Sequence, residues 1–156
     1  MSTRPLTIEQ INWLRVNAYL PPIVLLGVLF ICVTSSACLL TTFPESPFLV
    51  GFVAAAAILL VFIAVLTLLY ASRNYMDLRD GVAHVREARL VGKRRYKPRG
   101  SAARYYLRFD GLSELETLPE IYEQVDEGNV YTVIYSPHSQ RCWGVEAQAR
   151  SAEPAL

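Results

Sequence analysis

The fold is decided by residues 47–71, which read PFLVGFVAAAAILLVFIAVLTLLYA and contain no charged side chain. A helix needs about 20 apolar residues to cross the hydrocarbon core of a bilayer, and this run of 25 residues exceeds that length. We therefore predict a membrane-spanning helix over residues 47–71. The helix is expected to continue through residues 72–80 and to end at Gly81, because glycine is common just after the end of a helix.

A second apolar run precedes the first. Residues 23–40, IVLLGVLFICVTSSACLL, are 18 uncharged residues, and neighbouring residues extend the predicted span to about 21–41. A buried core helix is the alternative, since 18 residues is near the lower limit for crossing a bilayer. The loop between the runs, residues 41–46, has no lysine or arginine. Together the two runs predict a membrane α-helical hairpin within residues 23–80.

Basic residues flank this hairpin. Arg4 and Arg15 precede the first span, and seven lysines or arginines lie between positions 73 and 95, after the second span. Cytoplasmic segments close to membrane spans are enriched in lysine and arginine. We therefore expect both termini, and the domain that follows the hairpin, to lie in the cytoplasm.

The first 22 residues carry helix signals of their own. Thr7 and Gln10 have the spacing of a capping box, whereas the consecutive Pro21 and Pro22 disfavour a helix interior. We predict an N-terminal helix within residues 1–22 that lies at the membrane surface and ends at the prolines. One continuous, kinked helix is the alternative.

The two spans offer small residues but no ionisable ones. An ionisable residue inside a bilayer would indicate a functional site, and neither span has one. Gly51 and Ala55 form a small-residue patch, which permits close contact between helices. They are the predicted helix-packing residues, either within the hairpin or against a helix of another protein.

Residues 81–147 have the pattern of a small β domain. Strand signals occur at residues 82–91, 104–109, 113–117, 129–135 and 141–147. Thr117 and Glu120 form a second capping box, which starts a short helix before the fourth strand. This order predicts a small all-β, five-stranded barrel of the OB-like or SH3-like type. Its core candidates are Tyr105, Leu107, Phe109, Tyr131, Val133, Tyr135, Trp143 and Val145. Residues 148–156 are expected to be a disordered tail.

The segment YSPHSQ, residues 135–140, contains a histidine flanked by two serines. It joins two predicted strands, and serine and proline suit the first two positions of a type I turn. A serine hydrolase needs a nucleophile, a base and an orienting acid in a defined geometry, which neighbours in a tight turn rarely provide. We interpret the segment as a turn and predict no catalytic residue.

No metal or cofactor is predicted either. The three cysteines lack the paired spacing of zinc ligands, and the two histidines are far apart in the sequence. The chain also has no glycine-rich phosphate loop.

Charge is segregated within the β domain, although the net charge of the chain is only +1. Nine lysines or arginines and one acid lie between Arg86 and Arg108, whereas seven acids and no base lie between Phe109 and Glu127. The predicted partner- or anion-binding residues are Lys93, Arg94, Arg95, Lys97, Arg99 and Arg104. The predicted acidic docking face consists of Glu116, Glu120 and Glu123.

The basic residues fit several partners. An acidic protein surface and anionic lipid headgroups both attract lysine and arginine near a membrane. A solvated loop that only obeys the positive-inside rule is the third possibility. Nucleic acid is disfavoured as a partner, because the adjacent acids would repel its phosphates.

Residues 127–147, EGNVYTVIYSPHSQRCWGVEA, resemble the end of the soluble domain in small, uncharacterised bacterial membrane proteins with two helices and a C-terminal barrel. Those proteins share the pattern Gly-x-x-Tyr-x-Val-x-Tyr-x-Pro-x-Ser, matched here by Gly128, Tyr131, Val133, Tyr135, Pro137 and Ser139. The resemblance covers about the last half of the chain. It implies a barrel and a bacterial inner (plasma) membrane location, and it implies no activity.

These observations predict a non-enzymatic, membrane-anchored accessory or assembly subunit of a larger membrane protein complex. It would contact membrane lipids and other membrane protein subunits, and dock through its helices and its charged domain. The alternative is an independent membrane-tethered module that binds anionic lipid headgroups or another anionic ligand.

Overall fold

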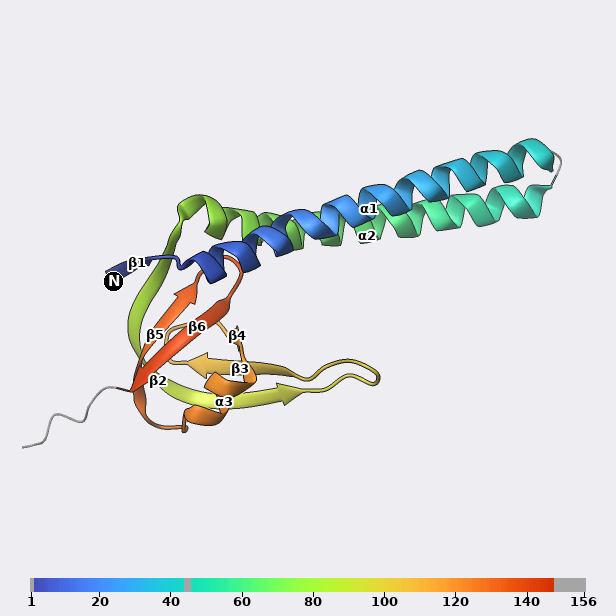
Figure 1. The fold of residues 1–156 in the computed structure, drawn as a ribbon. Helices are drawn as coiled ribbons and strands as arrows, with labels where there is room; N and C mark the ends of the chain where they lie inside the picture. The colour runs from blue at the N-terminus through green and yellow to red at the C-terminus, as the bar shows by residue number, and fades with distance from the viewer. Residues whose placement is uncertain (1, 44–45, 148–156) are drawn as a thin grey trace, which may run out of the picture. The chain divides into compact units, whose positions relative to one another are not determined.

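In the computed structural model the chain forms two long helices and a six-stranded sheet with one short helix (Figure 1). The structure describes residues 2–43 and 46–147, so the predicted tail at 148–156 lies outside the described residues. The chain divides into two compact units. We call Met1–Gln10 with Arg79–Leu156 the β unit, and Ile11–Leu78 the helical unit.

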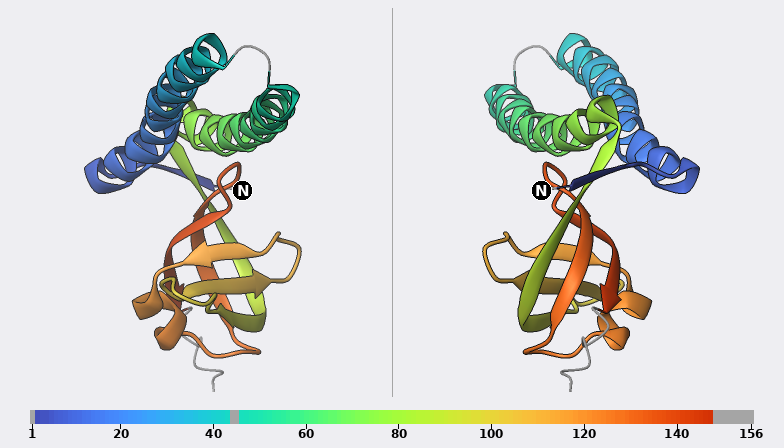
Figure 2. Two further views of the ribbon diagram at one scale, coloured as in Figure 1. Left: turned by 90° about the vertical axis from the view of Figure 1, so that its right-hand side faces the viewer. Right: turned by 90° about the vertical axis from the view of Figure 1, so that its left-hand side faces the viewer.

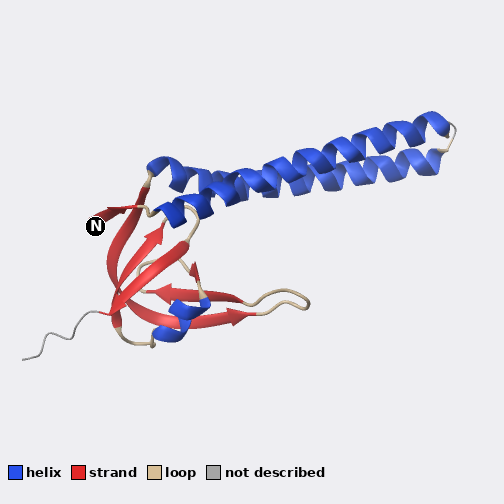
Figure 3. Cartoon of the chain, viewed as in Figure 1, coloured by secondary structure: helices blue, strands red, loops and turns tan. Residues whose placement is uncertain are grey.

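The two long helices are α1 (Ile8–Thr42) and α2 (Pro47–Asp80), blue in Figure 3. Both are long and apolar enough to cross a membrane. The less exposed side chains recur every three or four residues, which is the period of one helix face. They are Leu14, Ala18, Leu25, Leu29, Cys32, Ser36 and Leu40 on α1, and Val53, Ala56, Leu60, Ala64, Thr67, Ala71 and Asn74 on α2. Most of the other apolar surface is exposed, including Phe30 at 71% and Phe48 at 82%, which favours lipid over water around it.

Each helix continues beyond its apolar stretch as a polar segment. Residues 8–17 of α1 and residues 72–80 of α2 contain charged and amide side chains. Nine residues of helix add about 14 Å at 1.5 Å per residue. At the inner border of these segments, the Tyr70 hydroxyl donates a hydrogen bond to Asn17 Oδ1 at 2.9 Å. We call the two polar segments the stalk.

The N-terminal region differs from the helix predicted for residues 1–22. Ser2–Pro5 form strand β1, and α1 then runs through both prolines without a break. The capping box is confirmed, because the Thr7 N–H donates to Gln10 Oε1 at 3.0 Å. Each proline removes the hydrogen bond that its N–H group would have donated, and its ring crowds the carbonyl four residues earlier. The rest of the long apolar helix keeps its own backbone hydrogen bonds, and α1 continues through the pair.

The β unit follows the predicted order of strands and helix, with one strand added at the N-terminus. Its elements after α2 are β2 (Val82–Tyr96), β3 (Arg104–Phe109), β4 (Leu115–Thr117), α3 (Pro119–Gln124), β5 (Val130–Ser136) and β6 (Arg141–Ala147). Figure 2 shows how strongly these strands twist.

The sheet is mixed and closes unevenly. Its strand order is β1-β2-β3-β4-β6-β5, and β2 also pairs with β5. The β2–β5 pairing runs from His84 to Arg89 and is antiparallel. In contrast, β4 and β6 are parallel and meet in one residue pair, Glu116 with Arg141. The ring of strands is therefore held by few backbone contacts where β4 meets β6.

The core of the β unit agrees with most of the predicted residues. Leu107, Phe109, Tyr131, Val133 and Tyr135 are buried, whereas Tyr105, Trp143 and Val145 are half-buried. Buried residues that the list of core candidates did not contain are Ala88, Leu90, Leu115, Val125 and Cys142.

Strand β1 ties the start of the chain to the segment after α2. Ser2 lies opposite Val85, and Pro5 lies opposite Val82, in an antiparallel pairing. The Leu6 N–H also donates to the Gly81 carbonyl at 3.2 Å. The chain therefore enters α1 and leaves α2 from two adjacent strands.

Candidate functional site

The strongest candidate site is the hairpin of β2 and β3, which extends beyond the rest of the sheet in Figure 1. A bulge lies between Leu90 and Gly92 of β2, and beyond it the strand pairs only with β3 on one side. Such bulges bend a strand and increase its twist. We call residues 93–104 the basic arm, because they contain six lysines or arginines and no acid.

Lys93 serves the structure of the β unit. Its ammonium group donates to the Val125 carbonyl at 2.8 Å, just after α3. The same group lies 4.4 Å from the centre of the Tyr122 ring. A cation near the C-terminal end of a helix satisfies carbonyls that lack a helical partner. Lys93 is therefore engaged within the protein, in contrast to its predicted place among the binding residues.

Two arginines of the arm stack on tyrosines of the facing strand. Arg94 lies opposite Tyr106 and 5.0 Å from its ring centre. Arg95 lies opposite Tyr105 and 5.6 Å from its ring centre. Consecutive residues point to opposite faces of a strand, so each face of the arm carries one arginine–tyrosine stack. These contacts stabilise a ribbon that has no hydrophobic core of its own.

The arginines differ in their acidic partners. Arg94 Nη2 lies 2.7 Å from Glu114 Oε2 in an ion pair. Arg95, Lys97 and Arg99 are exposed, and among residues 2–43 and 46–147 no carboxylate pairs with them. A guanidinium that stacks on a ring keeps its in-plane N–H donors. Arg95, Lys97 and Arg99 are thus the part of the arm best suited to an external anion.

Arg104 completes the predicted basic set. It is exposed at the start of β3 and lies opposite Tyr96. Tyr96 itself is 56% exposed. The end of the arm therefore combines cations with an exposed aromatic ring.

The predicted acidic docking face is spread over two elements. Glu116 is half-buried on β4, and its N–H donates to the Gln140 carbonyl at 2.8 Å. Glu120 and Glu123 are exposed on α3. Two other acids of this segment contact the arm: Glu114 pairs with Arg94, and Glu127 accepts the backbone N–H of Lys93. The acidic and basic segments are therefore joined by these two contacts.

Glu127 is a site residue that the sequence did not reveal. Its carboxylate accepts a hydrogen bond from the backbone N–H of Lys93 at 2.8 Å. It thereby covers one donor on the edge of β2 that β3 does not use. Nothing in its position after α3 distinguishes it from the other acids nearby.

Two further cations on β2 also have structural roles. Arg86 donates to the Gly111 carbonyl at 3.0 Å, and Arg89 donates to the Gly128 carbonyl at 2.8 Å. Both glycines lie in turns and have positive φ. With Lys93, three basic residues of β2 satisfy backbone carbonyls at the ends of elements. Part of the basic run therefore has a structural role.

The predicted packing residues of α2 lie away from the less exposed stripe of that helix. Gly51 and Ala55 are both exposed, and a Cβ atom at Gly51 would meet no atom within 4 Å. Within the hairpin they therefore make no close contact in this structure. Their surface is open to another apolar helix or to lipid.

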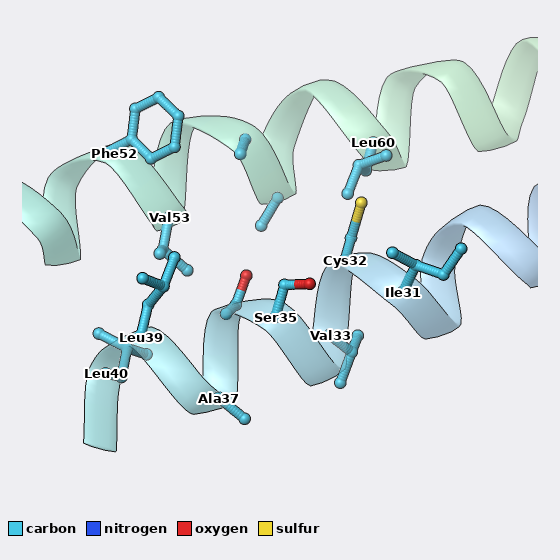
Figure 4. Close-up of a pocket in the computed structure, with 13 residues that line it drawn as sticks. Ile31, Cys32, Val33, Ser35, Ala37, Leu39, Leu40, Phe52, Val53 and Leu60 are labelled. Carbon is cyan, nitrogen blue, oxygen red and sulfur yellow. The ribbon is translucent and has the colours of Figure 1, made fainter. Parts of the chain in front are cut away.

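A groove of about 520 Å³ separates α1 and α2 near residues 31–40 and 52–60 (Figure 4). Figure 4 shows Cys32 and Ser35 of α1 pointing toward α2, and Val53 of α2 pointing toward α1. The small side chains Ala56 and Ala57 also line it. Its walls are almost wholly apolar.

The YSPHSQ segment forms the turn between β5 and β6. Buried Ser136 accepts a hydrogen bond from Trp143 Nε1 at 2.8 Å, which holds the serine in a structural role. His138 Nε2 lies 3.4 Å from Asp80 Oδ2. Gln140 adopts φ 55°, as is common for a residue that ends a tight hairpin turn.

The β unit also contains a buried thiol. Burial raises the pKa of Cys142 from 9.0 to about 11. A neutral thiol is a poor nucleophile. Within residues 2–43 and 46–147, no group of three or more His, Cys, Asp or Glu is arranged to hold a metal ion.

Comparisons with protein-family models, with curated proteins and with solved structures found no match to this chain. The layout of two long apolar helices before a β domain is consistent with the resemblance of residues 127–147 to small bacterial membrane proteins. The proposal for function rests on the geometry described above.

Proposed function

We propose that this protein is a non-enzymatic, membrane-anchored accessory or assembly subunit of a larger membrane protein complex. The observation that carries the proposal is the exposed small-residue surface of α2. Gly51 and Ala55 are exposed, and a Cβ atom at Gly51 would meet no atom within 4 Å. Small residues permit the close approach of another helix, so this surface favours a helix of a partner protein.

The β unit is proposed to be an OB-like barrel, in preference to an SH3-like one. The ring order β2-β3-β4-β6-β5 with return to β2 supports this proposal. So does the position of α3 between β4 and β5, the third and fourth strands of the ring in chain order. In OB folds the loop between the first two strands of the ring contributes to binding, and here that loop is the end of the basic arm.

The anchor is proposed to lie in the bacterial plasma membrane, with both termini and the β unit in the cytoplasm. Two features support this orientation. Lysine and arginine are concentrated after α2, and the β1–β2 pairing requires both ends of the hairpin to lie on one side of the membrane. Reporters active only in the cytoplasm, fused to each terminus, should both be active. An active fusion in the 41–46 loop would contradict the orientation.

The docking function is tested by purifying the tagged full chain from its native membranes in mild detergent. We expect specific membrane protein subunits to co-purify. Gly51→Leu with Ala55→Leu should reduce this co-purification at least several-fold, because bulky side chains prevent close helix approach. Val61→Leu, also at an exposed position of α2, is the control and should have little effect. The proposal fails if no protein co-purifies with the folded wild-type chain.

The alternative function, an independent module for anionic lipid or another anionic ligand, is favoured by one observation. Arg95, Lys97 and Arg99 have no carboxylate partner within the part of the chain that the structure describes. In this case the full chain in phosphatidylcholine nanodiscs should bind phosphatidylglycerol vesicles. Neutralising these three residues should abolish that binding, and no protein should co-purify.

A further inference from the structure

The edge of β2 that faces away from β3 has a different hydrogen-bond partner at each successive position as the strand enters the basic arm. The β5 pairing ends at Arg89. At Leu90 the edge is continued by the turn before β5, because the Leu90 N–H donates to the Asn129 carbonyl at 2.9 Å. At Lys93 the Glu127 carboxylate accepts the backbone N–H at 2.8 Å. A carboxylate thus replaces the missing neighbouring strand at this position.

The next equivalent position along this edge is Arg95. In an antiparallel pair, alternate residues direct their N–H and C=O groups toward the partner strand, and the residues between direct them away. The Lys93 N–H points away from β3, so the N–H and C=O of Arg95 point the same way. Among the residues that the structure describes, no strand or side chain occupies this edge at Arg95.

We propose that the edge of the basic arm at Arg95 binds an extended, acidic segment of a partner protein. The partner would add a short strand to this edge, as peptides do in other exposed sheets. One of its carboxylates would contact the arm as Glu127 does at Lys93. The inference rests on the proposed docking function and specifies its surface and the chemistry of the partner.

Three features favour an acidic peptide segment as the occupant. The Arg95 side chain is already oriented by its stack on Tyr105, so less conformational entropy is lost on binding. Lys97 and Arg99 follow on the exposed end of the arm and complement negative charge. Glu127 is an internal example of a protein carboxylate on the same edge.

Other occupants fit this edge less well. A second copy of the arm would bring six more cations against the first, and like charges on facing strands are destabilising. A lipid headgroup offers phosphate oxygens but no backbone groups to continue the ladder. Binding to a lipid surface is the competing result that the experiment distinguishes.

The experiment uses the full chain in phosphatidylcholine nanodiscs and a blocked, fluorescent peptide of alternating glutamate and valine. Fluorescence anisotropy should show saturable binding that weakens as salt rises. Arg95→Gln should weaken binding about threefold, through loss of charge. Arg95→Pro should weaken it about tenfold, because loss of the N–H removes about one further hydrogen bond. Proline is tolerated at edge positions whose N–H is unused, and a thermal melt checks the fold.

A second pair of variants distinguishes strand pairing at the edge from nonspecific electrostatic attraction. Glu127→Ala frees the Lys93 N–H and lengthens the open edge, so the peptide should bind about fivefold more tightly, as expected for one added hydrogen bond. Glu123→Ala makes the same change in net charge on exposed α3 and should increase affinity less than twofold. Equal effects of these two variants would overturn the edge-pairing inference.

Two results overturn the inference as a whole. One is absence of peptide binding while the same nanodiscs bind phosphatidylglycerol vesicles, which would assign the arm to lipid. The other is unchanged peptide binding in both Arg95 variants. In either case, co-purification that depends on Gly51 and Ala55 would still support the docking function, so the two proposals fail separately.

Discussion

The Tyr70 hydroxyl of α2 donates a hydrogen bond to Asn17 Oδ1 of α1 at 2.9 Å, at the border between the apolar spans and the stalk. We predict that Tyr70→Phe lowers the stability of the helical unit by about 0.5–1 kcal/mol, the usual size of such bonds between membrane helices. Reversible unfolding in mixed micelles, followed by Trp13 fluorescence, measures the change. Tyr75→Phe keeps the ring contact with Tyr19 and serves as the control. An equal loss in both variants would contradict a specific role for the hydrogen bond.

Lys93→Met should destabilise the β unit, because it removes the donor to the Val125 carbonyl and the cation over Tyr122. We expect the free energy of unfolding to fall by about 1–2 kcal/mol. The measurement is urea unfolding of the full chain in detergent, followed by Trp143 fluorescence in a Trp13→Phe background. The matched Lys97→Met variant changes an exposed cation of the same arm and should stay within about 0.5 kcal/mol of the parent protein. Similar losses in the two would refute the division of the arm into structural and free cations.

Ser136→Ala tests the structural role of the YSPHSQ segment. Ser136 is fully buried, and the substitution removes the hydrogen bond from Trp143 Nε1 to Ser136 Oγ. We predict a loss of about 1–3 kcal/mol of stability with a changed Trp143 emission, and no loss of partner co-purification at temperatures where the variant is folded. Loss of co-purification from a folded and equally abundant variant would show that the turn has a functional role.

The raised pKa of Cys142 predicts a stability change at alkaline pH. The fold favours the neutral thiol, with a pKa of about 11 against a reference of 9.0. The contribution is therefore fully present below pH 9 and is lost as pH rises toward 11. A shift of this size corresponds to at most about 3 kcal/mol. Unfolding at pH 8 and pH 10.5 should show a smaller pH effect in Cys142→Ala than in the parent protein. An identical pH effect in both proteins would exclude the thiol as a cause.

The helices and most strands could be predicted because their patterns are local. Residues 47–71 specify a long apolar helix, and the predicted end at Asp80 is where α2 ends. Residues 104–109 and 141–147 have strand signals and form β3 and β6 with the predicted bounds. In each case neighbouring residues in the sequence carry the information.

Strand β1 and the end of β2 depend on contacts far away in the sequence. Ser2–Pro5 have no apolar alternation, and they form a strand because residues 82–85 lie beside them. The prediction ended the first strand of the domain at residue 91, whereas β2 continues to Tyr96. Arg94 and Arg95 extend it by stacking on tyrosines of β3, a contact that no local pattern reveals.

The candidate site was predicted as a set of basic residues. In the structure some of them contact other parts of the protein and others are exposed without a carboxylate partner among the described residues. In the sequence, Lys93, Arg94 and Arg95 are consecutive basic residues that cannot be told apart by role. Their different roles follow from α3, from Glu114 and from Glu127, all of which come from later segments of the chain. Composition can therefore locate a charged surface but cannot separate structural cations from those available to a partner.

The pairing of β1 with β2 also affects the biogenesis of the protein. During synthesis β1 emerges before both helices, and its partner residues 82–85 emerge only after both. The strand must therefore wait, unpaired, until both helices have been made. A chain whose helix ends were held apart could not form this pairing. The first strand of the chain therefore joins the sheet only after about 80 residues have been synthesised, and its register depends on where the two long helices leave their ends.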